Sequence, residues 1–246
     1  MKSIDRLMKY SLQIVSGLVL LSAMLPCEAA EELVTSAHYS DGKAIPYILN
    51  YQTSKPQYVI ILFPGGDGEL RARMKNGKLV YRFKNNFLIR TRHLIVDDDF
   101  ATAATDSTQS QERIQAVLDD LHTRFPLAKI YLMSTSNGTF DSMYLAAYLS
   151  SRIAGEIHTS ARSEASLFDA RQYKNRQLFV HHRNDNCRVT PFAAVEWGHE
   201  KYGNELIVME GGKSVGDDCK AFAYHGYNGI EQQTIEAIKA WIKKGD

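Results

Sequence analysis

The feature that most constrains the fold of this chain is a continuous apolar run that ends in glycines, YVIILFPGG at residues 58–66. A strand with one face in water alternates apolar and polar residues, whereas a strand covered on both faces is apolar throughout. The run therefore predicts a buried strand in a mostly parallel sheet. Helices must then cover both faces of that sheet.

The rest of the chain alternates β-rich runs with amphipathic helical runs, which is the pattern of an α/β protein. In one helical run, Ile114, Val117, Leu118 and Leu121 fall on a single face. Thr190 and Pro191 are expected to begin a further helix, as its cap and its first-turn proline. We expect strands at 44–51, 58–66, 100–106, 128–134, 155–161, 177–182 and 204–212, and helices at 85–95, 110–125, 138–153 and 229–244.

The first 29 residues have the features of a secretory signal peptide. Three basic residues precede an apolar stretch at 14–25, and small residues follow it at Ala29 and Ala30. The stretch is shorter than the roughly 20 residues that a membrane-spanning helix needs, which disfavours a retained anchor. We expect cleavage after Ala29 or Ala30, and a periplasmic or secreted protein in which residues 30–246 form one domain.

Composition narrows the classes of function. The 246 residues include 29 basic and 28 acidic side chains, and residues 1–29 hold three of the basic and two of the acidic ones, so the mature chain is neutral. A general role in binding nucleic acid or a membrane surface therefore has no electrostatic support.

Two cysteines, Cys187 and Cys219, remain once the expected leader is removed. In an exported protein, two cysteines most simply form a disulfide. Closing a loop of 31 intervening residues stabilises the fold by roughly 3–4 kcal/mol in the chain-entropy model.

The turn after the strand at 128–134 carries a candidate nucleophile. The segment STSNGT leads directly into a helical run, and a strand-to-helix turn with the pattern x-Ser-x-Gly is typical of a nucleophile elbow. Ser136 stands at the apex of this turn, and Gly138 lets the helix begin close to the strand. Ser134 occupies a position where glycine is usual, so the motif alone leaves a plain Ser- and Thr-rich capping turn as an alternative.

A serine nucleophile also needs donors for the developing oxyanion. Gly65 and Gly66 follow the buried apolar strand, and Asn137 follows the candidate nucleophile. In hydrolases whose serine lies on a nucleophile elbow, one backbone N–H comes from the loop after such a strand and the other from the residue after the serine. Asn137 and either Gly65 or Gly66 are thus the candidate oxyanion donors.

The order serine, acid, histidine is satisfied along the chain. Asp185 follows the strand at 177–182, and His225 lies between the final strand and the final helix. Asp217 and Asp218 are alternative acids, although they lie on the same loop as the histidine. Asp185 and His225 are therefore the candidate acid and base.

The segment HHRNDNC, residues 181–187, also has the composition of a metal site. His181 and His182 are adjacent on an expected strand, so their side chains should point to opposite faces. Cys187 has an oxidised partner in Cys219. We therefore expect no metal at this segment.

Taken together, these segments resemble the alpha/beta-hydrolase superfamily, and within it small exported bacterial serine hydrolases. The resemblance covers residues 58 to about 235 and is carried by FPGGDGEL, NNFLIRTRHL, STSNGT, HHRNDNCRVTPFA and CKAFAYHGYNGIE. It implies Ser136 as nucleophile, Asp185 as acid and His225 as base, without a metal or organic cofactor. It implies no particular substrate, because this fold carries many kinds of hydrolase.

We expect an exported serine hydrolase that cleaves a carboxylic ester or related acyl bond of a small-molecule or acyl substrate. A secreted serine peptidase or a transacylase would use the same groups, and a non-catalytic binding protein on this scaffold is the non-enzymatic alternative. Only about fifteen residues, 162–176, lie where a cap domain is usually inserted, so we expect no cap. A Cys187–Cys219 disulfide should hold the acid loop and the base loop in register.

Overall fold

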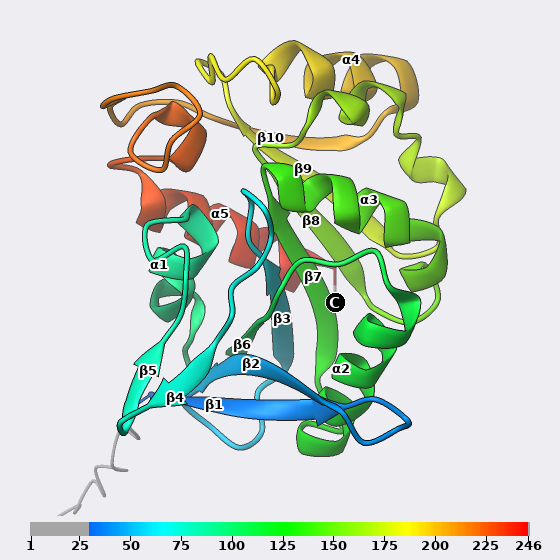
Figure 1. The fold of residues 1–246 in the computed structure, drawn as a ribbon. Helices are drawn as coiled ribbons and strands as arrows, with labels where there is room; N and C mark the ends of the chain where they lie inside the picture. The colour runs from blue at the N-terminus through cyan, green and yellow to red at the C-terminus, as the bar shows by residue number, and fades with distance from the viewer. Residues whose placement is uncertain (1–29, 246) are drawn as a thin grey trace, which may run out of the picture.

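The computed structural model describes residues 30–245, so the predicted signal peptide lies outside the described residues. Its centre is an eight-stranded sheet (Figure 1). In sheet order, the strands are β1 (Glu31–His38), β2 (Ala44–Tyr51), β6 (Phe100–Ala104), β3 (Tyr58–Phe63), β7 (Lys129–Thr135), β8 (Gly155–Thr159), β9 (Arg176–His182) and β10 (Glu205–Met209). Strand β2 runs antiparallel to both of its neighbours, whereas the six strands from β6 to β10 in this order are mutually parallel.

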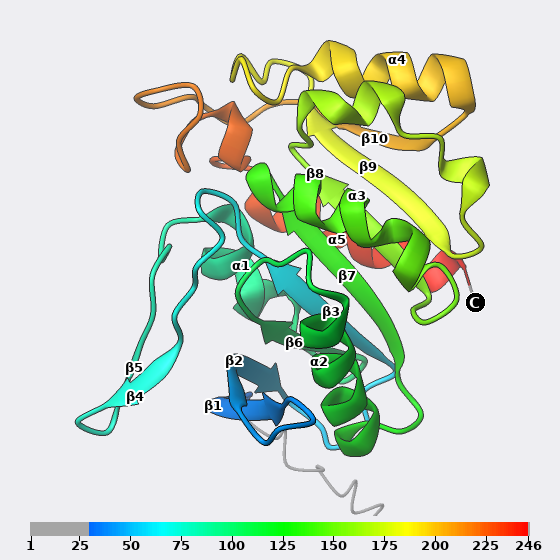
Figure 2. The same ribbon diagram turned by 45° about the vertical axis from the view of Figure 1, so that its right-hand side comes forward.

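Helices cover both faces of the sheet, as predicted (Figure 2). The helices are α1 (Phe87–Ile95), α2 (Gln111–Arg124), α3 (Asn137–Leu149), α4 (Phe192–Tyr202) and α5 (Glu231–Lys244). Ile60 and Leu62 of β3 belong to the core under α1 and α5, whereas Val59 and Ile61 belong to the core under α2 and α3. All six residues of β3 are buried, which confirms the prediction of a buried strand from the apolar run.

Four elements differ from the sequence-based expectations. Strand β1 and a hairpin of β4 (Arg73–Lys75) and β5 (Lys78–Val80) were not expected. The helix after β9 begins at Phe192 with Pro191 at its N-cap, and no side chain caps it. The prediction of Thr190 as a helix cap is therefore wrong, because its hydroxyl contacts the side chains of Asp185 and His225 instead.

The connection between β8 and β9 contains only two short 3-10 helices, Ser163–Leu167 and Ala170–Gln172. No cap domain is inserted there, as expected. Within residues 30–245, no helix is both long enough and apolar enough to cross a bilayer.

Candidate active site

The candidate residues gather at the carboxyl edge of the parallel sheet. The loops that follow β3, β7, β9 and β10 meet at this edge (Figure 1), which is where ligands bind in open α/β sheets. A cavity of about 470 Å³ opens there and is lined by Ser136, His225, Gly65 and Gly66. Three segments that are distant in sequence thus contribute to one site.

Ser136 adopts the strained backbone conformation of a nucleophile elbow. Its φ is 54° and its ψ is −127°, a region that costs a non-glycine residue about 1–3 kcal/mol. Its N–H donates to the carbonyl of Thr159 at 3.2 Å, and its carbonyl accepts from the backbone N–H of Thr139 at 2.9 Å and from the hydroxyl of Thr139 at 2.7 Å. These bonds hold the turn between β7 and α3, so the serine is presented at the sheet edge.

Two glycines let the backbone pack tightly around this turn. A Cβ atom on Gly65 would lie 2.8 Å from the Cβ of Ser136, and one on Gly138 would lie 2.6 Å from the carbonyl oxygen of Pro64. Both distances are shorter than real Cβ contacts. Glycine is therefore required at both positions, which keeps the loop after β3 against the elbow.

Ser134, the departure from the usual elbow pattern, is accommodated in the core. Its side chain is fully buried, and its Oγ lies 2.7 Å from the Oγ of Ser142 on α3. Ser142 Oγ in turn lies 3.0 Å from Nδ1 of His158 on β8. The extra hydroxyl thus has a partner, and the strained turn forms despite it.

His225, which lines the cavity, forms a hydrogen-bonded pair with Asp185. Nδ1 of His225 lies 3.0 Å from Oδ2 of Asp185, and both side chains are buried. Burial by itself would raise the pKa of Asp185, but hydrogen bonds from His181 and His225 outweigh burial and hold this pKa well below its usual range. The ionised carboxylate therefore accepts the Nδ1 proton, which leaves Nε2 of His225 able to act as a base.

Two further residues, for which the sequence predicted no role at the site, contact this pair. The hydroxyl of Thr190 lies 3.2 Å from Oδ2 of Asp185 and 3.1 Å from Nδ1 of His225. Nε2 of His181 lies 3.0 Å from the carbonyl of Thr190 and 3.3 Å from Oδ2 of Asp185. The only signal in the sequence was positional, with Thr190 five residues after the acid and His181 four residues before it, because their contacts depend on how the loop folds back.

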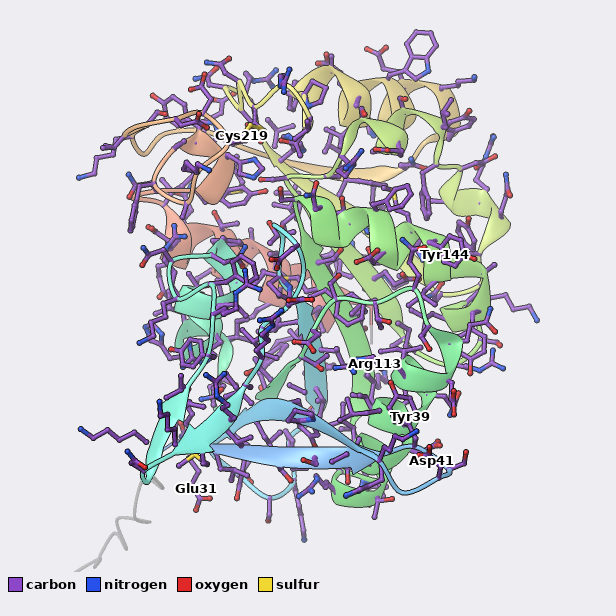
Figure 3. All side chains as sticks on the ribbon, in the orientation of Figure 1. Glu31, Tyr39, Asp41, Arg113, Tyr144 and Cys219 are labelled. Carbon is purple, nitrogen blue, oxygen red and sulfur yellow. A yellow bond between two sulfur atoms is a disulfide. The ribbon has the colours of Figure 1, made fainter. Side chains whose placement is uncertain are left out.

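The expected disulfide between Cys187 and Cys219 is present. The backbone N–H of Cys187 donates to Oδ1 of Asp185 at 2.9 Å, while Cys219 lines the cavity. Figure 3 shows Cys219 on the loop that leads to His225. The bridge thus connects the loop of the candidate acid to the loop of the candidate base.

The two histidines at the end of β9 have separate surroundings, as predicted. His181 contacts the Thr190 carbonyl, whereas Nε2 of His182 lies 2.9 Å from the carbonyl of Gly211 and its ring stacks on Tyr224. Among residues 30–245, no three histidine, cysteine or acidic side chains come together as a metal site.

Comparisons with known proteins place the chain by its fold. No family model matches its sequence, and no curated protein matches it either. An esterase domain of a Rhodothermus marinus protein has a TM-score of 0.59 at 10% identity, covering 87% of this chain and 99% of that one. Est1E from Butyrivibrio proteoclasticus has a TM-score of 0.58 at 18% identity, over 86% and 99% of the two chains. A serine hydrolase without a lid from Xanthomonas campestris has a TM-score of 0.54 at 12% identity, over 85% and 95%.

Proposed function

We propose that this chain, which has the alpha/beta-hydrolase fold, is a serine hydrolase that cleaves a carboxylic ester or related acyl bond. The observation that carries the proposal is the buried His225–Asp185 pair, joined at 3.0 Å, whose histidine shares a cavity with Ser136 at its strained turn. The esterases among the structural neighbours support an ester over other acyl substrates.

In the proposed reaction, Nε2 of His225 takes the proton of the Ser136 hydroxyl as Oγ forms a bond to the substrate carbonyl carbon. The carbonyl oxygen becomes an oxyanion, which accepts from the backbone N–H of Asn137 and from that of Gly65 or Gly66. Asn137 is the first residue of α3, so its N–H has no acceptor within the helix.

The tetrahedral intermediate then collapses. The bond to the leaving alcohol breaks, His225 donates its proton to the alcohol oxygen, and an acyl-enzyme remains on Ser136. Asp185 stabilises the charged imidazole in both halves of the reaction. Water, deprotonated by His225, then attacks the acyl carbon. The bond to Oγ of Ser136 breaks, His225 returns the proton to Oγ, and the carboxylic acid is released.

The test is labelling with a fluorophosphonate, which reacts with activated serines. The wild-type protein should be labelled and Ser136→Ala should not, while Ser134→Ala, a serine two residues away in the core, should still be labelled. An unlabelled wild type would reject the proposal. Turnover of p-nitrophenyl esters without turnover of aminopeptidase substrates would then distinguish an ester hydrolase from a peptidase.

We also propose that the protein is exported and processed. The disulfide between Cys187 and Cys219 supports an oxidising compartment, and the leader-like residues 1–29 supply the export signal. Cell fractionation followed by N-terminal sequencing should find a periplasmic or secreted chain that begins at Ala30 or Glu31. A cytoplasmic chain with an intact leader would contradict export.

A further inference from the structure

Among the residues that the structure describes, the charged ones that line the cavity beside Ser136 and His225 have one sign only, and both are exposed to solvent. Lys84 and Lys220 line it, and none of its lining residues is an aspartate or a glutamate. A cleft lined by one sign of charge raises the local concentration of the opposite ion. The lining of the site therefore favours a negatively charged ligand.

The protein does not neutralise these two lysines. Nearby cations are paired, Arg82 with Asp67 and Glu69, and Arg90 with Glu231. Nζ of Lys84 lies 5.7 Å from the centre of the Tyr81 ring. Within residues 30–245, neither Lys84 nor Lys220 forms an ion pair.

The acidic residues closest in sequence to Lys220 are Asp217 and Asp218, and neither lines the cavity. Oδ1 of Asp217 accepts the backbone N–H of Cys219 at 2.9 Å, within its own turn. Both are exposed to solvent, as Lys84 and Lys220 are, so water and salt weaken all four charges. Neither aspartate lines the cavity, so the positive charge there stays available to a ligand.

The lysines come from two segments that are distant in sequence, and each has an apolar neighbour that also lines the cavity. Lys84 follows Phe83 just before α1, and Lys220 lies between Cys219 and Ala221 on the loop that the disulfide anchors. Such a lining combines apolar surface for a hydrocarbon portion with cationic ends for a charged group. Both features lie within the cavity that contains the proposed nucleophile.

We propose that the substrate of this site is an ester that carries a negatively charged group, and that Lys84 and Lys220 bind this group. The inference rests on the proposed hydrolase function and narrows its substrate class. The two lysines act on substrate binding, so we expect their removal to lower kcat/KM for negatively charged esters.

The test uses two pairs of esters that differ in charge. The first pair is p-nitrophenyl hexanoate and mono-p-nitrophenyl adipate, whose six-carbon acyl chain ends in a carboxylate. The second pair is 4-(methylsulfonyl)phenyl acetate and 4-sulfonatophenyl acetate, which place the charge in the leaving alcohol. The measured quantity is the ratio of kcat/KM for the anionic ester to that for the neutral ester, so differences in intrinsic reactivity cancel between enzyme variants.

For at least one pair, this ratio should fall about threefold in Lys84→Met or Lys220→Met and about tenfold in the double variant, as expected for exposed ion pairs. Raising the salt concentration to about 0.5 M should reduce the wild-type ratio in the same direction, because salt shortens the reach of exposed charges. Lys213→Met removes one charge from the same loop outside the cavity and should leave the ratio unchanged.

Failure of this inference is distinguishable from failure of the proposed function. If fluorophosphonate labels Ser136 but the ratio for both pairs is the same in the wild type and the double variant, the charge preference is wrong and the hydrolase stands. Binding of monomethyl adipate and of methyl hexanoate to Ser136→Ala provides a readout without turnover. We expect Ser136→Ala to bind monomethyl adipate more tightly than methyl hexanoate, and this difference to disappear when Lys84 and Lys220 are also replaced by methionine. Equal affinities for the two ligands, with or without the lysines, would overturn the inference.

Discussion

The side-chain amide of Asn137 donates to the carbonyl of Gly66 across 2.9 Å, which ties the residue after Ser136 to the loop after β3. Nη1 of Arg162 donates to Oδ1 of the same amide at 3.1 Å, and Glu164 accepts two further bonds from Arg162. The guanidinium therefore orients the amide so that its nitrogen faces Gly66. This row of contacts fixes the two proposed sources of oxyanion donors relative to each other.

Replacing the Asn137 side chain should therefore slow catalysis without removing its backbone N–H. We expect Asn137→Ala to lower kcat about tenfold, less than the roughly 10²–10³-fold loss that follows removal of an oxyanion donor itself. Asn137→Asp should be slower still, because it loses the same donor to Gly66 and also places a negative charge beside the developing oxyanion. Steady-state kinetics on a p-nitrophenyl ester measures both, and a kcat of Asn137→Ala within twofold of wild type would contradict this positioning role.

Asp185 should be the most sensitive position of the acid loop. Asp185→Asn removes the ionised acceptor of the His225 Nδ1 proton and favours the wrong tautomer of the imidazole. We expect kcat to fall by about 10⁴, with the folded structure retained by circular dichroism. A loss below tenfold would assign the acid role to another residue, with Asp217 and Asp218 as the next variants to measure.

Thr190 should position this pair through its hydroxyl. Thr190→Val keeps the shape of the side chain but removes the bonds to Asp185 and His225, and we expect kcat to fall about tenfold. Thr190→Ser retains the hydroxyl and should recover most of the loss. If valine and serine variants had the same kcat, the contact would be structural rather than positioning.

The sequence predicted the parts of this site that are set locally. The elbow at Ser136, the glycines after β3 and the loop positions of Asp185 and His225 each follow from a strand and the turn after it. The side-chain roles of Thr190 and Asn137 were not predictable in this way, because each depends on a partner in another loop. Thr190 also preceded a proline in a helix-start pattern, so its local signal indicated a cap that the structure does not use.

Edges of the fold were harder to predict than its centre. Strand β3 is buried on both faces and is apolar throughout, so its pattern was clear. Strand β1 lies at the edge of the sheet and is mostly exposed or half-buried. The β4–β5 hairpin is similarly exposed, and its strands pair only with each other. Neither segment needed the hydrophobic pattern on which the prediction relied.

The disulfide should support activity as well as stability. Cys187 donates its backbone N–H to Asp185, and Cys219 lines the cavity near His225. The double variant Cys187→Ser/Cys219→Ser should lose about 3 kcal/mol of unfolding free energy and should also have a lower kcat well below its Tm. Thermal unfolding and kinetics at 15 °C separate the two effects. Full activity in the folded double variant would show that the bridge only stabilises the fold.

Two buried ionisable groups on β8, Glu156 and His158, should give the unfolding free energy of the protein opposing pH dependences. Burial raises the pKa of Glu156 to about 7, although Gln177 and Asn175 donate to its carboxylate. Burial lowers the pKa of His158 to about 4. Between these values the folded protein disfavours the charged form of both groups, whereas the unfolded chain ionises each near its ordinary pKa.

The signs of the two contributions differ. The stability associated with neutral Glu156 is present below its unfolded pKa of 4.5 and is lost as pH rises to about 7. The stability associated with neutral His158 is present above its unfolded pKa of 6.5 and is lost as pH falls to about 4. The two slopes therefore oppose each other between pH 4.5 and 6.5.

Glu156→Gln should remove the pH dependence of the unfolding free energy that comes from Glu156 and leave the one that comes from His158. The unfolding free energy of this variant minus that of wild type should rise between pH 4.5 and 7, by on the order of 3 kcal/mol. The same difference for His158→Gln should rise as pH falls from 6.5 to 4, because the variant no longer has a histidine that protonates only when unfolded. Urea titrations at four pH values measure both differences. A difference for Glu156→Gln that stays constant with pH would mean that the carboxyl of Glu156 titrates alike in the folded and unfolded chain.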